Sequence, residues 1–220
     1  MFTPRLQQLQ VARVAGQLLE QLGQFTGDPL ILPIPADAPP EIPRIVLADP
    51  ARTMRLQVGM SRSDLFVNSR PGAPLAVEVV FAQAGDILEV LLGALQIRPG
   101  RLAATGTFYH KCADPPRELA AQFCKPEWLN GPLAELRSFE LHAHRRTELM
   151  EGLLVNSWVR CKSGSVSEGA MPSPAVVLER DVNTLQEEAE IREFRQDELK
   201  EFMRQAGSRL TLEIPEFFPR

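Results

Sequence analysis

The sequence of 220 residues predicts an α+β fold, in which helices pack on one face of a mostly antiparallel sheet. Its expected strands come in runs that helices separate, without strict alternation of strand and helix. Hydrophobic residues make up 44% of the chain and charged residues 24%, which is close to average globular usage. The chain can therefore bury a sizeable core, and disorder over most of its length is not expected.

The first part of the chain combines a helix, an extended segment and two strands. Apolar residues recur every three or four positions over residues 5–24, which predicts an amphipathic helix. Residues 29–50 are rich in proline and predict an extended strap across a core, because proline disfavours helix. Alternating apolar residues predict strands at 53–59 and 63–68, joined by a turn.

The middle of the chain carries its most regular apolar stripe. This stripe predicts a long core helix over residues 74–96, followed by a strand over residues 101–111. Asp114 directly precedes Pro115, which predicts the N-cap and first position of a short helix that ends at Cys124.

The last part of the chain is predicted as strands followed by a helix. The expected elements are strands at 137–147, 152–162, 175–183 and 210–214, and a helix at 193–207. The polar run over residues 161–174 predicts an exposed loop. Gly207 is expected to be the C-cap of the helix, since glycine commonly ends helices.

Two levels of organisation are expected along the chain. Residues 1–27 form an N-terminal amphipathic helix, and residues 28–220 form a single α+β domain. The stretches 61–69 and 145–157 share an arginine, a hydroxyl residue, an acid, a leucine and Val-Asn-Ser. A duplicated strand-strand-helix unit is one explanation, and a chance match is the other, because no longer period supports it.

Charge and cysteine content bear on partners and location. The net charge of −4 is unlike the basic footprint of a nucleic-acid-binding protein. No apolar run approaches the ~20 residues that a membrane helix needs, and the first residues do not resemble a signal peptide. The cysteine count of three argues against a disulfide framework. We expect a cytoplasmic protein with no cofactor, no nucleic-acid partner and no membrane partner.

His142 and His144 are the strongest candidates for metal ligands. Residues two apart on a strand project from the same face, so both imidazoles can reach one ion. Further ligands with similar spacing on other strands are His110, Cys112, Glu179 and Asp181. The alternative is that the histidines lie on the polar, outward face of an antiparallel sheet.

Arginines and one tryptophan are the candidates for a binding surface. The arginines that can converge to bind an anion are Arg62, Arg145, Arg146 and Arg160. Asn156, Trp158 and Arg160 share one face of a strand, whereas Leu153, Val155, Val159 and Cys161 share the other, apolar face. The alternatives are a solvated face with cross-strand ion pairs and a tryptophan covered by a helix of the same chain.

Several segments carry a resemblance to a known family. They are IPADAPPEIPRIVLAD, a following strand with RSD, ELMEGLLVNSWVR, VVLERDVN and FRQDELKEFMRQA. Across residues 30–206 the chain resembles a sporadically distributed family of uncharacterised bacterial proteins. The resemblance implies a proline-rich strand leading into a sheet, a central helix and a late strand with Arg and Asn; it assigns no site residues. The outline is also similar to that of SecB-like export chaperones, which implies binding of unfolded clients.

The sequence contains no phosphate-binding glycine loop, nucleophile elbow or HExxH motif. We therefore expect a non-enzymatic binding or assembly protein, chaperone-like or linked to a toxin or defence system. The alternatives are a metal-dependent phosphoesterase that uses His142, His144 and Asp181, and a small-molecule sensor domain. We also expect a homodimer that the N-terminal helix mediates.

Overall fold

The structure is a computed structural model that describes residues 1–2, 9–35, 37–70, 73, 75–167, 171–211 and 217–218. The chain divides into two compact units: the first comprises Met1–Ala103 and Thr184–Ser208, and the second comprises Ala104–Asn183 and Arg209–Arg220. Each unit holds an antiparallel sheet together with helices, so the predicted α+β class is confirmed. This division differs from the expected single domain over residues 28–220.

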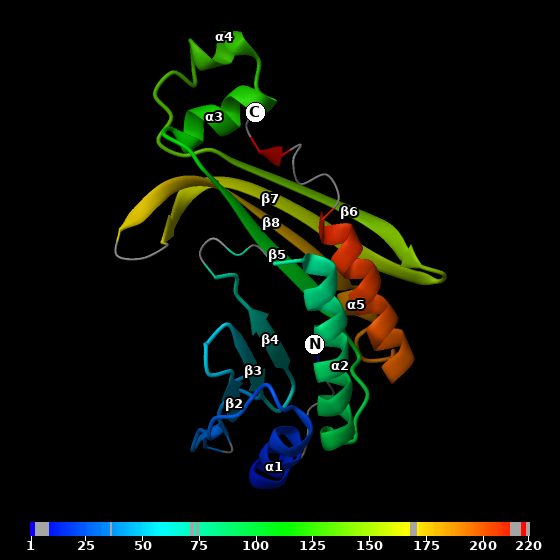
Figure 1. The fold of residues 1–220 in the computed structure, drawn as a ribbon. Helices are drawn as coiled ribbons and strands as arrows, with labels where there is room; N and C mark the ends of the chain where they lie inside the picture. The colour runs from blue at the N-terminus through cyan, green and yellow to red at the C-terminus, as the bar shows by residue number, and fades with distance from the viewer. Residues whose placement is uncertain are drawn as a thin grey trace. The chain divides into compact units, whose positions relative to one another are not determined.

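The first unit contains a small sheet with the strand order β1-β2-β3-β4 (Figure 1). Its strands are β1 (Leu30–Ile31), β2 (Ile45–Ala48), β3 (Met54–Val58) and β4 (Ser63–Val67). Its helices are α1 (Val11–Gln21), α2 (Val77–Leu95), the 3₁₀ helix η1 (Gln186–Glu188) and most of α5 (Gln196–Thr211). The proline-rich strap thus supplies two short strands, β1 and β2, to this sheet.

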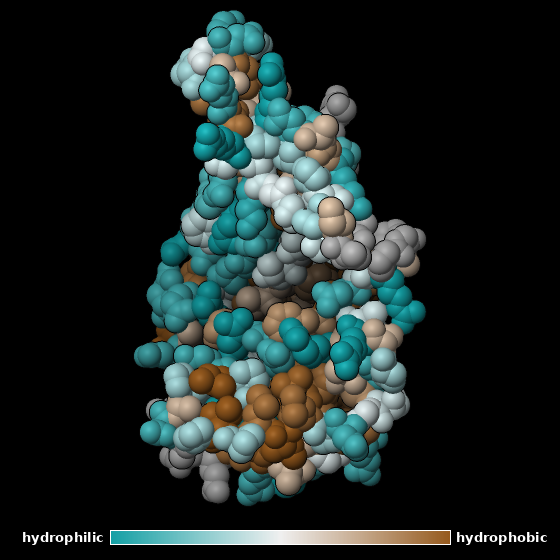
Figure 2. All heavy atoms as spheres, turned by 90° about the vertical axis from the view of Figure 1, so that its left-hand side faces the viewer, coloured by the Kyte–Doolittle hydropathy of each residue, from teal (hydrophilic) through white to brown (hydrophobic). Residues whose placement is uncertain are grey.

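Apolar side chains also reach the surface of the first unit. Figure 2 shows them gathering on one side of this unit. In its sheet, the exposed large apolar side chains are Leu30, Ile31 and Phe66. None of the helices in the described ranges has the length and apolar character that crossing a membrane would require.

Helix α1 buries its apolar face inside its own chain. Val14, Ala15 and Leu18 are at most 1% exposed, and the helix packs against α2. The apolar face that suggested self-association is therefore already covered. This burial gives no support to a homodimer mediated by the helix, which stays a prediction, and residues 5–8 of the expected helix lie outside the described residues.

Helix α5 lies close against α2 because a glycine faces the contact. A Cβ at Gly207 would lie 2.9 Å from the Cβ of Phe81 in α2. The Lys200 Nζ of α5 also lies 3.0 Å from Asp86 Oδ1 and 2.6 Å from Glu89 Oε2 of α2. The predicted C-cap role of Gly207 is wrong, since α5 continues to Thr211 and the glycine instead permits close helix packing.

The second unit contains the longer sheet, with the strand order β5-β8-β7-β6 (Figure 1). Its strands are β5 (Ala103–Lys111), β6 (Glu140–Met150), β7 (Leu153–Ser167) and β8 (Pro172–Thr184). Its helices are α3 (Pro115–Phe123) and α4 (Pro126–Leu129). Asp114 caps α3 as predicted, since its carboxylate accepts a hydrogen bond from the Arg117 N–H.

The core of the second unit lies on one face of this sheet. Leu119 of α3 is fully buried against Cys161 of β7 and Val176 and Leu178 of β8. Partly buried side chains packed around them include Phe108, Cys112, Phe139, Leu141, Val159, Phe217 and Phe218. The prediction that helices pack on one face of an antiparallel sheet is thus confirmed for this unit.

Two predicted elements in the last part of the chain are wrong. The sequence predicts a loop over residues 161–174, but β7 runs to Ser167 and β8 begins at Pro172. Pairing between β7 and β8 keeps these polar segments in strand conformation, although most of their side chains are exposed. The sequence also predicts a strand at 210–214, but Leu210 and Thr211 continue α5, and residues 212–214 lie outside the described part.

The internal similarity does not mark equivalent positions. Residues 61–69 contain the whole of β4, whereas residues 145–157 contain the end of β6, a turn and the start of β7. In the first stretch Val-Asn-Ser ends a strand, and in the second it lies within one. The different positions give no support to a duplicated unit, and a chance match remains as the explanation.

The close packing at Gly207 predicts that two helical glycines respond differently to replacement by alanine. We expect Gly207→Ala to destabilise the protein by about 1–3 kcal/mol, because the added methyl overpacks the contact with Phe81. Gly93→Ala in α2 is the matched control, since its Cβ would meet nothing within 4 Å. That substitution should be neutral or stabilise by up to ~1 kcal/mol, because alanine favours helix. Urea unfolding of both variants checks this; equal effects would contradict the packing described here.

Candidate functional site

The two faces of the sheet β5-β8-β7-β6 differ in character. On the inner face, the Leu153, Val155 and Cys161 side chains of β7 are fully buried. The opposite face, called here the outer face, carries polar and aromatic side chains. Its central members are Glu140, His142, His144 and Arg146 of β6, Asn156, Trp158 and Arg160 of β7, and Glu179, Asp181 and Asn183 of β8.

The pairing of β6 with β7 sets these side chains opposite one another. His142 faces Arg160, His144 faces Trp158, and Arg146 faces Asn156. The His144 and Trp158 rings stack with their centroids 4.1 Å apart. The prediction that His142 and His144 share a face is confirmed, as is the shared face of Asn156, Trp158 and Arg160.

A chain of hydrogen bonds runs from His144 to Asp181 across three strands. His144 Nε2 lies 3.0 Å from Asn156 Oδ1, and Asn156 Nδ2 donates to Asn183 Oδ1 at 3.3 Å. Asn183 Nδ2 in turn donates to Asp181 Oδ1 at 3.0 Å. Because an ionised carboxylate only accepts, the order of donors is fixed, and His144 must donate its Nε2–H.

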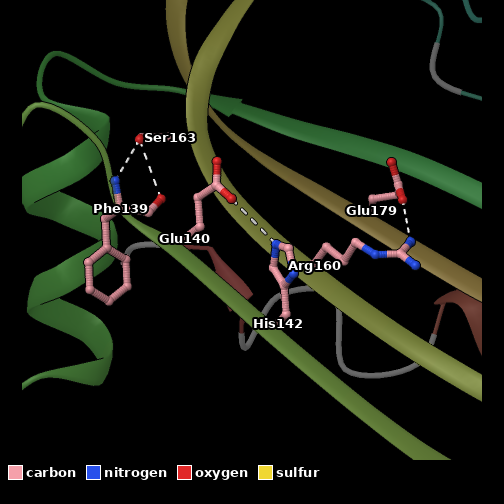
Figure 3. Close-up of polar contacts among 6 residues, drawn as sticks. All are labelled: Phe139, Glu140, His142, Arg160, Ser163 and Glu179. Carbon is pink, nitrogen blue, oxygen red and sulfur yellow. Dashed lines mark hydrogen bonds and ion pairs between the residues drawn. The ribbon is translucent and has the colours of Figure 1, made fainter.

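Arg160 forms the charged centre of the outer face. Its Nη1 donates to Glu179 Oε1 in an ion pair and lies 3.9 Å from Asp181 Oδ2. Figure 3 shows the Arg160 side chain reaching Glu179, and Glu140 turned toward His142. The Arg160 guanidinium also lies 5.1 Å from the Trp158 ring centroid, within cation–π range.

Two of the remaining arginine candidates, Arg145 and Arg146, do not join this centre. Arg145 lies on the opposite face of β6, because its neighbours His144 and Arg146 are on the outer face. Arg62 belongs to the first unit, where it pairs with Asp64 and lies over the Phe2 ring. Arg146 shares the face with Arg160, but the His144–Trp158 pair separates them. Within the second unit, Arg145 and Arg146 therefore do not converge with Arg160, whereas convergence with Arg62 stays a prediction.

The candidate metal ligands are divided between the two faces. His110 contacts the Phe218 ring, and Cys112 packs in the core, so both project from the inner face. Asp181 contacts Arg160 and Asn183 rather than the histidines. Within the described residues, no three His, Cys, Asp or Glu side chains are placed to hold a metal ion. The metal site assembled from these strands is thus not supported.

Two of the cysteines are poor candidates for a nucleophile. Burial raises the pKa of the Cys161 thiol to about 11, and it also raises that of Cys112. A thiol with a raised pKa carries little of the thiolate that reacts. Both cysteines therefore act as small apolar side chains in the core of the second unit.

Asn183 is the site residue that the sequence did not single out. It is 6% exposed and links Asn156 to Asp181. Its spacing of two residues from Asp181 on a predicted strand already places it on the same face. Its partner Asn156 lies on a different strand, and strand order is not visible in the sequence.

Comparison with protein-family models, with curated proteins and with solved structures finds no match for this chain. The site must therefore be judged by its own geometry. Its histidines, amides and carboxylates hydrogen-bond mainly to one another, and its aromatic and charged groups lie on a broad sheet face.

The order of the hydrogen bonds predicts the tautomer of His144. At mildly alkaline pH, nitrogen NMR spectra should show His144 protonated at Nε2 and bare at Nδ1. Asn156→Ala removes the acceptor, so the variant should show a mixture of tautomers. His142, which lies 3.5 Å from Glu140 instead, serves as the internal control. A native His144 protonated at Nδ1 would contradict the network.

Proposed function

We propose that the chain is a non-enzymatic binding protein, and that the outer face of the sheet β5-β8-β7-β6 contacts a protein partner. The observation that carries this proposal is the stack of His144 and Trp158 beside Arg160 on a sheet face that remains partly open to solvent. Arg160 is 30% exposed, and His142 is 52% exposed.

The composition of this face supports protein recognition. Tryptophan, tyrosine and arginine are enriched among the residues that dominate binding energy at protein interfaces. Trp158 and Arg160 supply two of these types, and Leu154 of β7 adds an apolar side chain that is 48% exposed. A partner that covers these groups would leave the ion pair between Arg160 and Glu179 intact.

The arrangement of polar groups favours binding over catalysis. The Glu179 carboxylate already pairs with the Arg160 guanidinium, and the Asp181 carboxylate already accepts a hydrogen bond from the side-chain amide of Asn183. His144 is held by Asn156 as a hydrogen-bond donor. These contacts fix the side chains as a rigid surface, although His144 keeps a lone pair on Nδ1 of the kind that a general base uses.

Narrower forms of the proposal concern location and biological role. We propose a cytoplasmic protein, in keeping with its cysteine content. A chaperone-like role, or a role beside a toxin or a defence system, fits a partner-binding face. The amide and charge network supplies the preorganisation that reduces the entropy lost on binding.

Substitutions on the two faces of one hairpin test the proposal. A partner is first isolated with the native chain from its own cells, and its affinity is then measured with purified components by calorimetry. Trp158→Ala should weaken binding about thirtyfold or more, since truncated hot spots cost about 2 kcal/mol or more. Arg145→Ala, an exposed change on the opposite face of β6, should leave the affinity unchanged.

Circular dichroism must show that both variants remain folded. Equal affinity of the Trp158→Ala variant and the native chain would refute the outer face as the contact. A phosphoesterase activity lost in His142→Ala/His144→Ala would instead support the enzyme alternative.

A sensor function is the second candidate, and a groove in the first unit favours it. The groove has a volume of about 970 Å³ and lies between the end of α2 and the start of α5. Its lining includes Leu92, Gly93, Arg98, Phe194 and Asp197. Volumes of this size accommodate small ligands. Small molecules that raise the melting temperature of the native chain but not of Gly93→Trp would promote this candidate.

A further inference from the structure

Strand β6 is an edge strand of its sheet, and one side of it faces away from β7. The order β5-β8-β7-β6 gives β6 one neighbour, and within the described residues no strand pairs with its other side. Residues 142–146 are exposed in succession, so side chains on both faces of β6 reach solvent there. An unpaired edge of this length is a template for adding another strand.

The hydrogen bonds show which backbone groups point away from β7. Ser163 N donates to Phe139 O at 3.0 Å, and the same register pairs His142 with Arg160. Because antiparallel pairs alternate, the even-numbered residues of β6 direct their N–H and C=O groups outward. Glu148 agrees with this alternation, since its C=O accepts from Arg209 Nη2 at 3.4 Å.

This capping by Arg209 limits the edge that another strand can use. Beyond Glu148 the pairing of β6 with β7 becomes irregular at Met150. The outward stretch that can pair with a strand is therefore Glu140–Arg146, with the backbone groups of Glu140, His142, His144 and Arg146 directed outward.

We propose that a second copy of this chain pairs with β6 along this stretch, antiparallel, about a two-fold axis at Ala143. Glu140 of each copy then lies opposite Arg146 of the other, and His142 lies opposite His144. Opposite charges directly across a strand pair stabilise it. Ala143, which is exposed and small, meets its own copy at the axis, where side chains approach closely.

Charge selects this register over its neighbours. An axis at His144 would set Glu140 opposite Glu148, which pairs like charges. An axis at His142 would pair only residues 140–144 and would leave Arg146 without an opposite residue. The Ala143 axis alone among these sets Glu140 opposite Arg146, at both ends of the outward stretch.

The dimer would unite the two sheets and their outer faces. A two-fold axis perpendicular to a sheet keeps the same face of both copies on one side, so the two outer faces become continuous. The interface involves few side chains, and interfaces below about 1,200 Å² belong to weak complexes. We therefore expect a weak dimer whose population rises with protein concentration. This inference does not depend on the proposed partner.

Charge reversal tests the register directly. Sedimentation velocity over a concentration series should show that Glu140→Arg and Arg146→Glu each weaken the dimer about tenfold, because each creates two like-charge pairs. The double variant Glu140→Arg/Arg146→Glu should return to within about threefold of the native dimer. Glu20→Arg, an exposed reversal in α1, is the control and should change nothing.

Proline tests the edge independently of charge. The His142 and His144 N–H groups point away from β7, so His142→Pro/His144→Pro spares that pairing while removing two donors to the second copy. We expect a folded monomer by circular dichroism and sedimentation. A native chain that stays monomeric at every concentration, or a dimer that survives both the proline and the single charge changes, would overturn the proposal.

Discussion

The antiparallel pairing of β6 with β7 decides which side chains share the outer face. With His144 set opposite Trp158, the apolar residues Leu153 and Val155 of β7 lie in the core, fully buried. A slip of one residue would turn every side chain of a strand to the other face. The inner face of the second unit therefore fixes the outer face: the cost of exposing its core holds the histidines, amides and arginine in their places.

Within that register, the polar side chains of the outer face form hydrogen bonds and ion pairs with one another. His144 donates to Asn156, Asn156 donates to Asn183, and Arg160 neutralises Glu179. Such networks rigidify a surface when each member has its partner. The result is a surface whose shape and charge are set by its own internal contacts.

Much of this surface follows from the sequence, because alternation along a strand is a local property. The shared face of His142 and His144, and the division of β7 into a core face and a face with Trp158, need only a period of two. Strand order is not a local property, so the sequence alone does not predict the contacts of Asn183 and Asp181. The loop expected at 161–174 fails for a related reason, since pairing with a neighbouring strand maintained a segment whose own composition favours a turn. Gly207 was assigned to a helix end because its contact with Phe81 comes from distant sequence.

Amide hydrogen exchange, read residue by residue by NMR, tests the β6 register most directly. In dilute protein, the Ala143 and Arg145 amides should exchange slowly, because they donate to β7. The His142 and His144 amides point outward and should exchange quickly, then slow as the protein concentration rises and the second copy covers them. The reverse pattern, with His142 and His144 protected at every dilution and Ala143 and Arg145 open, would contradict the register and the outer face that depends on it.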